Sequence, residues 1–159
     1  MTGDSIPITI RRATADDQPV IRRMVRQARL DPTHLKWPNF VVAEHAGSVV
    51  GIGQVRPYPA GRELGSLVVR EDLRGRGIGR LITERLLNDE PGIVYLECAA
   101  DMTPYYERFG FREIDRRDAP GPLRIKSAVG NLFARLMGTR IAVMKLDRAE
   151  GNTFLRKAS

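Results

Sequence analysis

The chain has 159 residues, enough for one domain with its own core, and 42% hydrophobic and 28% charged residues indicate a soluble globular protein. A net charge of +7 points to an anionic partner such as nucleic acid, a membrane surface or a phosphorylated small molecule. A single cysteine, Cys98, excludes an intramolecular disulfide and a cysteine metal cluster, and no metal is expected. The sequence has neither an apolar run of membrane-spanning length nor an N-terminal signal-peptide pattern, so we expect a cytoplasmic protein without a membrane partner.

The positive charge is concentrated in one segment. Residues 1–115 hold 16 basic and 16 acidic side chains, whereas residues 116–146 hold 7 basic side chains and 1 acidic side chain. The aromatic content of this segment is Phe133 alone, on an expected apolar stripe, and stacking on nucleic acid needs exposed aromatic residues. The patch therefore argues against a nucleic-acid partner and in favour of an anionic substrate or a protein surface.

The first half of the chain predicts a strand, a helix and three further strands. Thr14 is expected to cap the helix, whose apolar residues from Val20 to Ala28 follow helical spacing. A short helical turn is expected from His34 to Trp37. The predicted strands are residues 6–11, 40–44, 49–55 and 63–69, and a turn over residues 57–62 separates the last two.

The second half begins with a helix from Ile78 and a buried strand over residues 93–98. Thr103 and Pro104 are expected to be the N-cap and first position of a helix over residues 105–109, which Gly110 ends. A strand over residues 111–114, an amphipathic helix over residues 123–137 and a strand over residues 140–146 follow. Residues 1–146 are therefore expected to form one domain, and residues 147–159 a disordered tail.

A glycine-rich segment joins the fourth strand to the next helix. The free N–H groups at a helix N-terminus bind anions, and glycine lets an anion approach the backbone, so this segment can hold a phosphate. It lacks the Gly-Lys-Ser/Thr of a Walker A loop and follows an antiparallel meander, unlike the dinucleotide fingerprint. A tight turn without a ligand is the alternative. The segment comprises Arg74, Gly75, Arg76, Gly77, Ile78 and Gly79.

A second motif, Tyr106-x-x-Phe109-Gly110-Phe111, lies about 25 residues after this segment. In this order and separation, the two motifs resemble the GNAT superfamily of acetyl-CoA-dependent N-acetyltransferases over about residues 6–114 and the last strand. The resemblance implies an α/β (α+β) fold with helices flanking a central, mixed, mainly antiparallel, twisted sheet of about six to seven strands. It also implies that the strands splay after the fourth strand to admit CoA.

The resemblance implies how acetyl-CoA, a co-substrate, would bind. Backbone amides of Arg74 to Gly79 would hold the CoA diphosphate, and the main chain of Leu67, Val68 and Val69 would hold the pantetheine arm. Many relatives have an asparagine after the fifth strand that contacts this arm, whereas this chain has Ala99-Ala100-Asp101. That contact is therefore missing, or is replaced by Asp101 or Thr103, although Asp101 is better explained as a helix cap.

Two residues are expected to move protons. The resemblance makes Tyr106 the acid that protonates the departing CoA thiolate, since a tyrosine with a pKa near about 10 stays protonated at neutral pH. A buried core aromatic is the alternative. An alkyl amine must lose a proton before it attacks, and Glu63 is the first choice of base, with Glu97 or water in reserve. A solvated Glu63, or one paired with Arg62, is the alternative.

The expected function is transfer of an acetyl group from acetyl-CoA to the primary amine of a small molecule, directly within a ternary complex. The basic segment favours an amino acid or another anionic amine as acceptor. His34 and Trp37 lie where relatives line the acceptor pocket, whereas Cys98 has no activating neighbour in sequence and is expected to be structural. A non-catalytic acetyl-CoA sensor and a protein-lysine or N-terminal acetyltransferase are the alternatives, and the helix over residues 123–137 could form a homodimer face.

Overall fold

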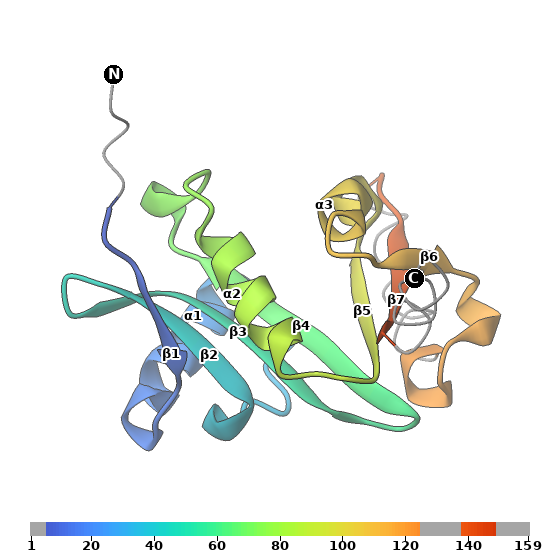
Figure 1. The fold of residues 1–159 in the computed structure, drawn as a ribbon, viewed down its shortest axis with the longest axis horizontal. Helices are drawn as coiled ribbons and strands as arrows, with labels where there is room; N and C mark the ends of the chain where they lie inside the picture. Colours follow the sequence, from blue (N-terminus) through green and yellow to red (C-terminus); the bar gives the residue numbers. More distant parts are fainter. Residues whose placement is uncertain (1–5, 125–137, 149–159) are drawn as a thin grey trace, which may run out of the picture. The chain divides into compact units, whose positions relative to one another are not determined.

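The computed structural model describes residues 6–124 and 138–148, which contain seven strands in one sheet (Figure 1). The strand order is β1-β2-β3-β4-β5-β7-β6. The pairs β1/β2, β2/β3, β5/β7 and β6/β7 are antiparallel and β4/β5 is parallel, which confirms the expected mixed, mainly antiparallel sheet. The strands are β1 (Thr9–Arg12), β2 (Phe40–His45), β3 (Ser48–Tyr58), β4 (Gly61–Val69), β5 (Ile93–Ala99), β6 (Arg112–Ile114) and β7 (Ile141–Asp147).

Three α-helices and five short 3₁₀ turns connect the described strands. The helices are α1 (Gln18–Gln27), α2 (Ile78–Asn88) and α3 (Thr103–Glu107). The 3₁₀ turns are η1 (Ala15–Asp17), η2 (Trp37–Asn39), η3 (Glu71–Leu73), η4 (Ala100–Met102) and η5 (Arg116–Asp118). In the part of the chain that the structure describes, no helix is long and apolar enough to cross a membrane.

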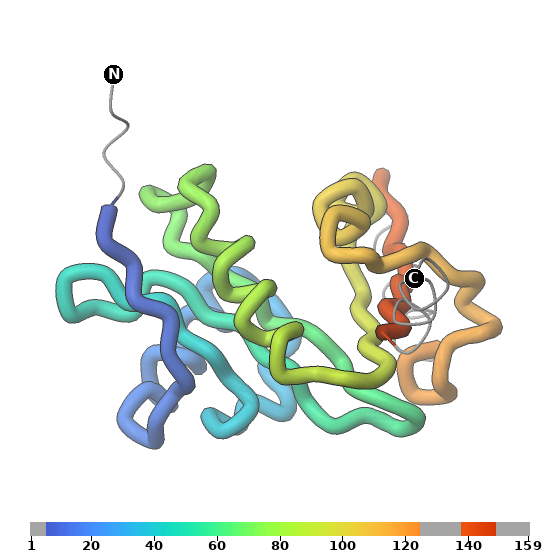
Figure 2. The backbone as a smooth tube through the Cα atoms, in the orientation of Figure 1, coloured from blue at the N-terminus to red at the C-terminus, as the bar shows by residue number. Residues whose placement is uncertain are grey.

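The chain forms two compact units. The first unit comprises Met1–Val55 and Leu64–Asp89, and the second comprises Arg56–Glu63 and Glu90–Ser159. The backbone path in Figure 2 runs through β2 and β3 into a long β3–β4 hairpin, and the tip of this hairpin belongs to the second unit. The glycine-rich segment therefore lies in the first unit, whereas Glu63 and Tyr106 lie in the second.

In the first unit, α1 and α2 pack against residues that alternate along β3. Ile21 and Val25 of α1 lie in one buried cluster with Ile52 of β3. The neighbours of Ile52 point to the other face, because successive residues of a strand alternate. They are Gly51 and Gly53, and a Cβ at either position would lie 2.8 Å from a methyl group of Ile82 in α2. These glycines allow α2 to pack directly on the strand.

A buried carboxylate fixes the start of α1. Asp17 is 6% exposed and accepts hydrogen bonds of 2.8 and 3.0 Å from the Arg11 guanidinium. It also accepts a 2.7 Å bond from the backbone N–H of Thr14, the residue expected to cap this helix. The Arg11 bond, opposed by burial and aided by Thr14, lowers the pKa of Asp17. Strand β1 and the first turn after it are thereby joined by a charge-assisted contact.

In the second unit, β5 is the central strand, as expected. It pairs with β7 along its whole length, from Ile93/Asp147 to Ala99/Ile141. On its other edge, Val94 and Tyr95 pair in parallel with Arg62 and Glu63 of β4. The expected divergence of β4 and β5 beyond these pairs involves both units and stays a prediction. Buried side chains cover the strand, namely Tyr95, Ala119, Leu123 and Val143.

Several expected boundaries differ from the structure. The β3–β4 turn is shorter than residues 57–62, because β3 continues to Tyr58 and β4 begins at Gly61. Thr103 is the first residue of α3 rather than its N-cap, and its hydroxyl donates back to the Ala100 carbonyl at 3.0 Å. Residues 121–124 are helical, while the rest of the helix expected over residues 123–137 lies outside the described residues. Strand β7 includes Asp147, and residues 149–159 of the expected tail also lie outside them.

Candidate functional site

The turn before α2 is built on two left-handed glycines. Gly75 has a φ of +76° and Gly77 a φ of +78°, a region that side chains other than glycine rarely adopt. Both residues are exposed, and a Cβ at either position would meet no heavy atom within 4 Å. Neither glycine is needed to avoid a protein contact, so the backbone here is left open for a ligand to approach.

The same turn presents positive charge and backbone donors. Gly77 is the N-cap of α2, so the first N–H groups of this helix have no partner within the helix itself. Arg74 and Arg76 are exposed on the turn, whereas Ile78 is 1% exposed and anchors the helix in the core. The helix dipole, the open glycines and the two guanidinium groups together suit a diphosphate.

Strand β4 leads into this turn. Val68 packs its side chain in the α1 core, so its backbone is the part left to contact a ligand, while Leu67 and Val69 are half-buried. The Val69 carbonyl accepts a 3.1 Å bond from Nε of Arg74, which folds the arginine back onto the strand end. The backbone N–H of Arg70 donates to the Val50 carbonyl of β3 at 2.8 Å. These bonds fix the end of β4 against the turn.

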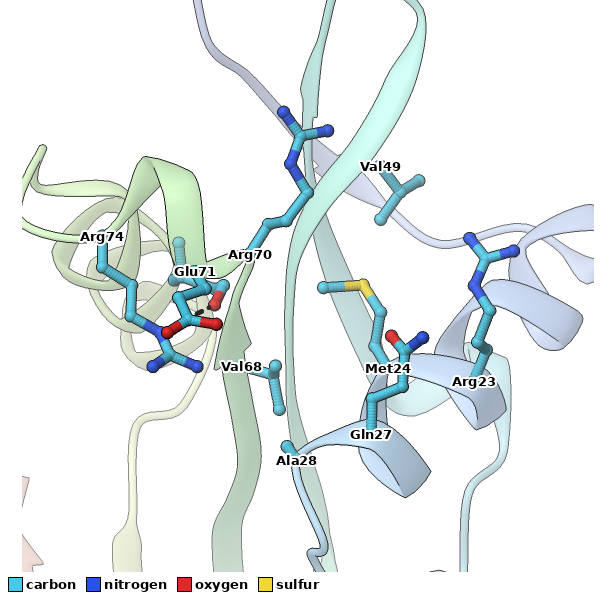
Figure 3. Close-up of a pocket in the computed structure, with 10 residues that line it drawn as sticks. Arg23, Met24, Gln27, Ala28, Val49, Val68, Arg70, Glu71 and Arg74 are labelled. Carbon is cyan, nitrogen blue, oxygen red and sulfur yellow. Dashed lines mark hydrogen bonds between the residues drawn. The ribbon is translucent and has the colours of Figure 1, made fainter.

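A cavity of about 330 Å³ opens in the first unit beside the end of β4. Helix α1 contributes Arg23 and Gln27, and the segment after β4 contributes Arg70, Glu71 and Arg74 (Figure 3). Arg70 is paired with Asp72, whereas the described residues give Arg23 no acidic partner. The remaining wall is mainly apolar and is formed by Met24, Ala28, Val49, Val68 and Val69. A ligand with an anionic group and an apolar part suits this lining.

Tyr106 is a buried phenol in α3. It is 8% exposed and makes edge-to-face contacts with Tyr105 and Phe111, at ring distances of 5.0 and 6.1 Å. Burial raises its pKa, and the nearby Cys98 and Tyr105 raise it further. The group is therefore a neutral proton donor at physiological pH. Among the described side chains, none hydrogen-bonds to its hydroxyl.

Cys98 lies on β5 and is held as a neutral thiol. Burial, aided by the charges of Glu113 and Asp101 and opposed by Arg140, raises its pKa to about 11. Its S–H donates to Sδ of Met144 on β7 at 3.8 Å. A nucleophilic cysteine needs the opposite environment, one that stabilises the thiolate. The structure therefore agrees with the expected structural role.

Glu63 is buried in the β3–β4 hairpin tip rather than solvated. It is 4% exposed, and its Oε2 accepts a 2.8 Å bond from Nε of Arg56. The expected alternative partner, Arg62, instead pairs with Glu90 at 3.2 Å. Glu97, the reserve base, lies half-buried on β5 opposite Val143 of β7. Both carboxylates belong to the same unit as Tyr106.

The residues expected near the acceptor lie in an irregular segment of the first unit. Trp37 begins η2, is 37% exposed, and donates its backbone N–H to Oε1 of Gln18 at 3.0 Å. His34 is exposed with a φ of +57°. In the second unit, Asp101 lies within η4 and is exposed, and Met102 and Ala99 are the caps there, so the expected capping role of Asp101 is wrong.

Sequence reasoning overlooked one polar pair. Gln54 on β3 is 3% exposed, and its Nε2 donates to Oγ of Ser66 on β4 at 3.0 Å. The signal was present, because Gln54 is the one polar side chain in the otherwise apolar stretch from Val49 to Val55. Its partner could not be identified, because the register between neighbouring strands is not visible in local sequence.

Comparisons with known proteins agree with this geometry. Residues 36–113 match the model of the acetyltransferase (GNAT) domain family. The uncharacterized N-acetyltransferase CT2212 of Chlorobaculum tepidum is 31% identical over 85 residues, which are 52% of this chain and 55% of that protein. The chain thus spans about half the length of this curated relative.

Two solved structures share the fold. N-acetylglutamate synthase from Neisseria gonorrhoeae, complexed with coenzyme A and N-acetyl-glutamate, superposes with a TM-score of 0.71 at 15% identity, over 89% of this chain and 35% of that one. Rv2747 from Mycobacterium tuberculosis, in complex with CoA, has a TM-score of 0.67 at 23% identity, over 87% and 98% of the two chains. At these identities, the likeness supports the α/β fold with its mixed sheet.

Proposed function

The chain carries a GNAT-family acetyltransferase domain, and from this premise we propose that it transfers the acetyl group of acetyl-CoA to the primary amine of a small molecule. The turn before α2 carries the proposal. Its two left-handed glycines leave open backbone at a helix N-terminus, between exposed arginines. This arrangement suits the diphosphate of CoA, and the main chain of Leu67 to Val69 would then hold the pantetheine arm.

Tyr106 and Glu63 would handle the protons of the reaction. The amine nitrogen attacks the thioester carbonyl carbon, and the C–S bond breaks to leave a CoA thiolate. Tyr106, whose pKa burial raises, donates its phenolic proton to that sulfur. Glu63 accepts the proton that the nitrogen loses, directly or through water. Return of this proton to Tyr106 through solvent regenerates the protein, so the products are an acetamide and CoA thiol.

The cavity beside β4 supports an acceptor that carries an anionic group. Arg23 of α1 and Arg74 of the turn line it, and its wall also includes apolar side chains of Met24 and Val68. Guanidinium groups bind carboxylates and phosphates through paired hydrogen bonds. An amino acid or a similar anionic amine fits this chemistry better than a polycationic amine, because like charges repel at such a surface.

The test is turnover with a panel of acceptors. Purified protein is incubated with acetyl-CoA and amino acids, neutral amines, polyamines or peptides, and acetylated products are identified by mass spectrometry. We expect acetylation of at least one anionic amine, and a loss of about 10²–10⁴-fold in kcat for Tyr106→Phe without weaker CoA binding. Tight acetyl-CoA binding with no acetylated product from any acceptor would support the sensor alternative instead.

A further inference from the structure

Ser66 has a backbone conformation that its position in a strand does not explain. Its φ is +51°, in the left-handed region that non-glycine residues avoid. Four other described non-glycine residues share this feature, and all four lie outside strands: Arg29, His34, Ala46 and Ala60. Ser66 alone among these five interrupts a strand, directly before Leu67. Strained residues within regular elements cluster at functional sites.

The contact of Gln54 with Ser66 is a second, independent anomaly. Oε1 of Gln54 is buried and has no hydrogen-bond partner among the described residues, while its Nε2 donates to Oγ of Ser66. Buried polar groups are almost always satisfied, and an apolar side chain would fill this place without an orphaned oxygen. The bond to Ser66 is what the Gln54 amide provides here.

That bond fixes the direction in which Ser66 can donate. A serine hydroxyl has one hydrogen and two acceptor lone pairs. Because Oγ of Ser66 already accepts from the Gln54 amide, its own hydrogen remains to be donated to an oxygen of a ligand. Ser66 is half-buried rather than enclosed. Gln54 therefore holds Ser66 as an oriented hydrogen-bond donor.

The order of groups along β4 identifies the ligand atom, on the basis of the function proposed above. The CoA diphosphate would lie at the turn after β4, and the pantetheine arm would run back along Val69, Val68 and Leu67. The thioester comes next along CoA, and Ser66 comes next along the strand. We propose that the Ser66 hydroxyl donates to the thioester carbonyl oxygen, which gains negative charge when the amine attacks, and that Gln54 is the positioning residue for this hydroxyl.

Four variants test the assignment in the full chain, with acetyl-CoA and the best acceptor of the panel. Removal of one oxyanion donor lowers kcat by about 10²–10³-fold, and we expect this loss for Ser66→Ala with little change in KM or in the Kd of CoA. Gln54→Met should lower kcat less, while raising the Tm because the orphaned oxygen is gone. Ser66→Gly should lose kcat as Ser66→Ala does, but have the higher Tm because glycine tolerates the positive φ. Ala46→Gly relieves the same strain in the β2–β3 turn and should raise the Tm with kcat unchanged.

A double-mutant cycle separates positioning from a structural role. Because Gln54 acts through Ser66, Gln54→Met should lower kcat no further when Ser66 is already alanine. Additive losses, or a Ser66→Ala variant with wild-type kcat, would overturn the assignment. A wild-type protein that binds acetyl-CoA yet acetylates no acceptor would instead overturn the proposed function. A fall in Tm for Gln54→Met together with unchanged kcat would make the pair purely structural.

Discussion

Arg56 and Glu63 form a buried ion pair across the tip of the β3–β4 hairpin. Nε of Arg56 lies 2.8 Å from Oε2 of Glu63, and the two side chains are 13% and 5% exposed. Glu63 also pairs through its backbone register with Tyr95 of β5. The carboxylate that we propose as the base is thus held in place by a charge on the same hairpin.

Substitutions on the two sides of this pair should have different effects on activity. Removal of one partner of a buried pair destabilises a protein by about 3–5 kcal/mol, and we expect Glu63→Gln and Arg56→Met each to approach this loss. Glu63→Gln also removes the proton acceptor and should lower kcat by about 10²–10⁴-fold. Arg56→Met keeps the carboxylate and should retain most of the activity. Urea unfolding and kcat for both variants are the measurements, and equal losses of kcat would mean that the pair serves only to position the hairpin.

The Arg11–Asp17 pair should make stability depend on acid. The folded protein holds the pKa of Asp17 below its ordinary value, so its contribution is present above the unfolded pKa of about 3.9 and is lost as pH falls through the folded pKa. Asp17→Asn should therefore lower the free energy of unfolding by roughly 1.5–3 kcal/mol at pH 7, the range for a hydrogen bond to a charged group. The difference from the wild type should shrink below about pH 4. Asp16→Asn, one residue earlier on the exposed side of η1, is the matched control. A difference that persists at pH 2 would contradict this explanation.

The sequence predicted most of the fold because its signals are local. Alternation and turn residues located the strands, and the apolar stripe from Ile78 located α2, since both patterns follow from backbone periodicity. The glycine-rich turn was found for the same reason. The partners of Glu63 and Gln54 were not found, because they depend on which residues face each other across β3 and β4. The left-handed φ of Ser66 carries no residue-type signal, since serine is an ordinary strand residue in sequence.

Cys98 should react as a neutral thiol and play no chemical part in transfer. Because burial raises its pKa to about 11, alkylation by iodoacetamide at pH 8 should be far slower than for free cysteine, whose pKa is about 8.5, and should accelerate as pH rises toward 11. Cys98→Ala should leave kcat within about twofold, since transfer is direct. Rapid alkylation at pH 8, or an acetylated Cys98 peptide after incubation with acetyl-CoA, would favour a covalent intermediate instead.

Two glycines with the same backbone geometry separate strain from ligand binding. Gly77 and Gly47 have φ values of +78° and +74°, and a Cβ at either position would meet no heavy atom within 4 Å. Alanine at each should destabilise the fold by a similar amount, about 1–2 kcal/mol, because the left-handed region disfavours a Cβ. Gly47 lies in the β2–β3 turn, whereas Gly77 is the N-cap of α2, where a Cβ would stand between the backbone amides and the CoA diphosphate. Gly77→Ala should therefore raise the Kd of CoA by about tenfold or more, a loss of about 1.4 kcal/mol, while Gly47→Ala leaves it unchanged. Calorimetric titration of both variants with CoA measures this difference, and equal Kd values would mean that the turn before α2 does not bind the diphosphate.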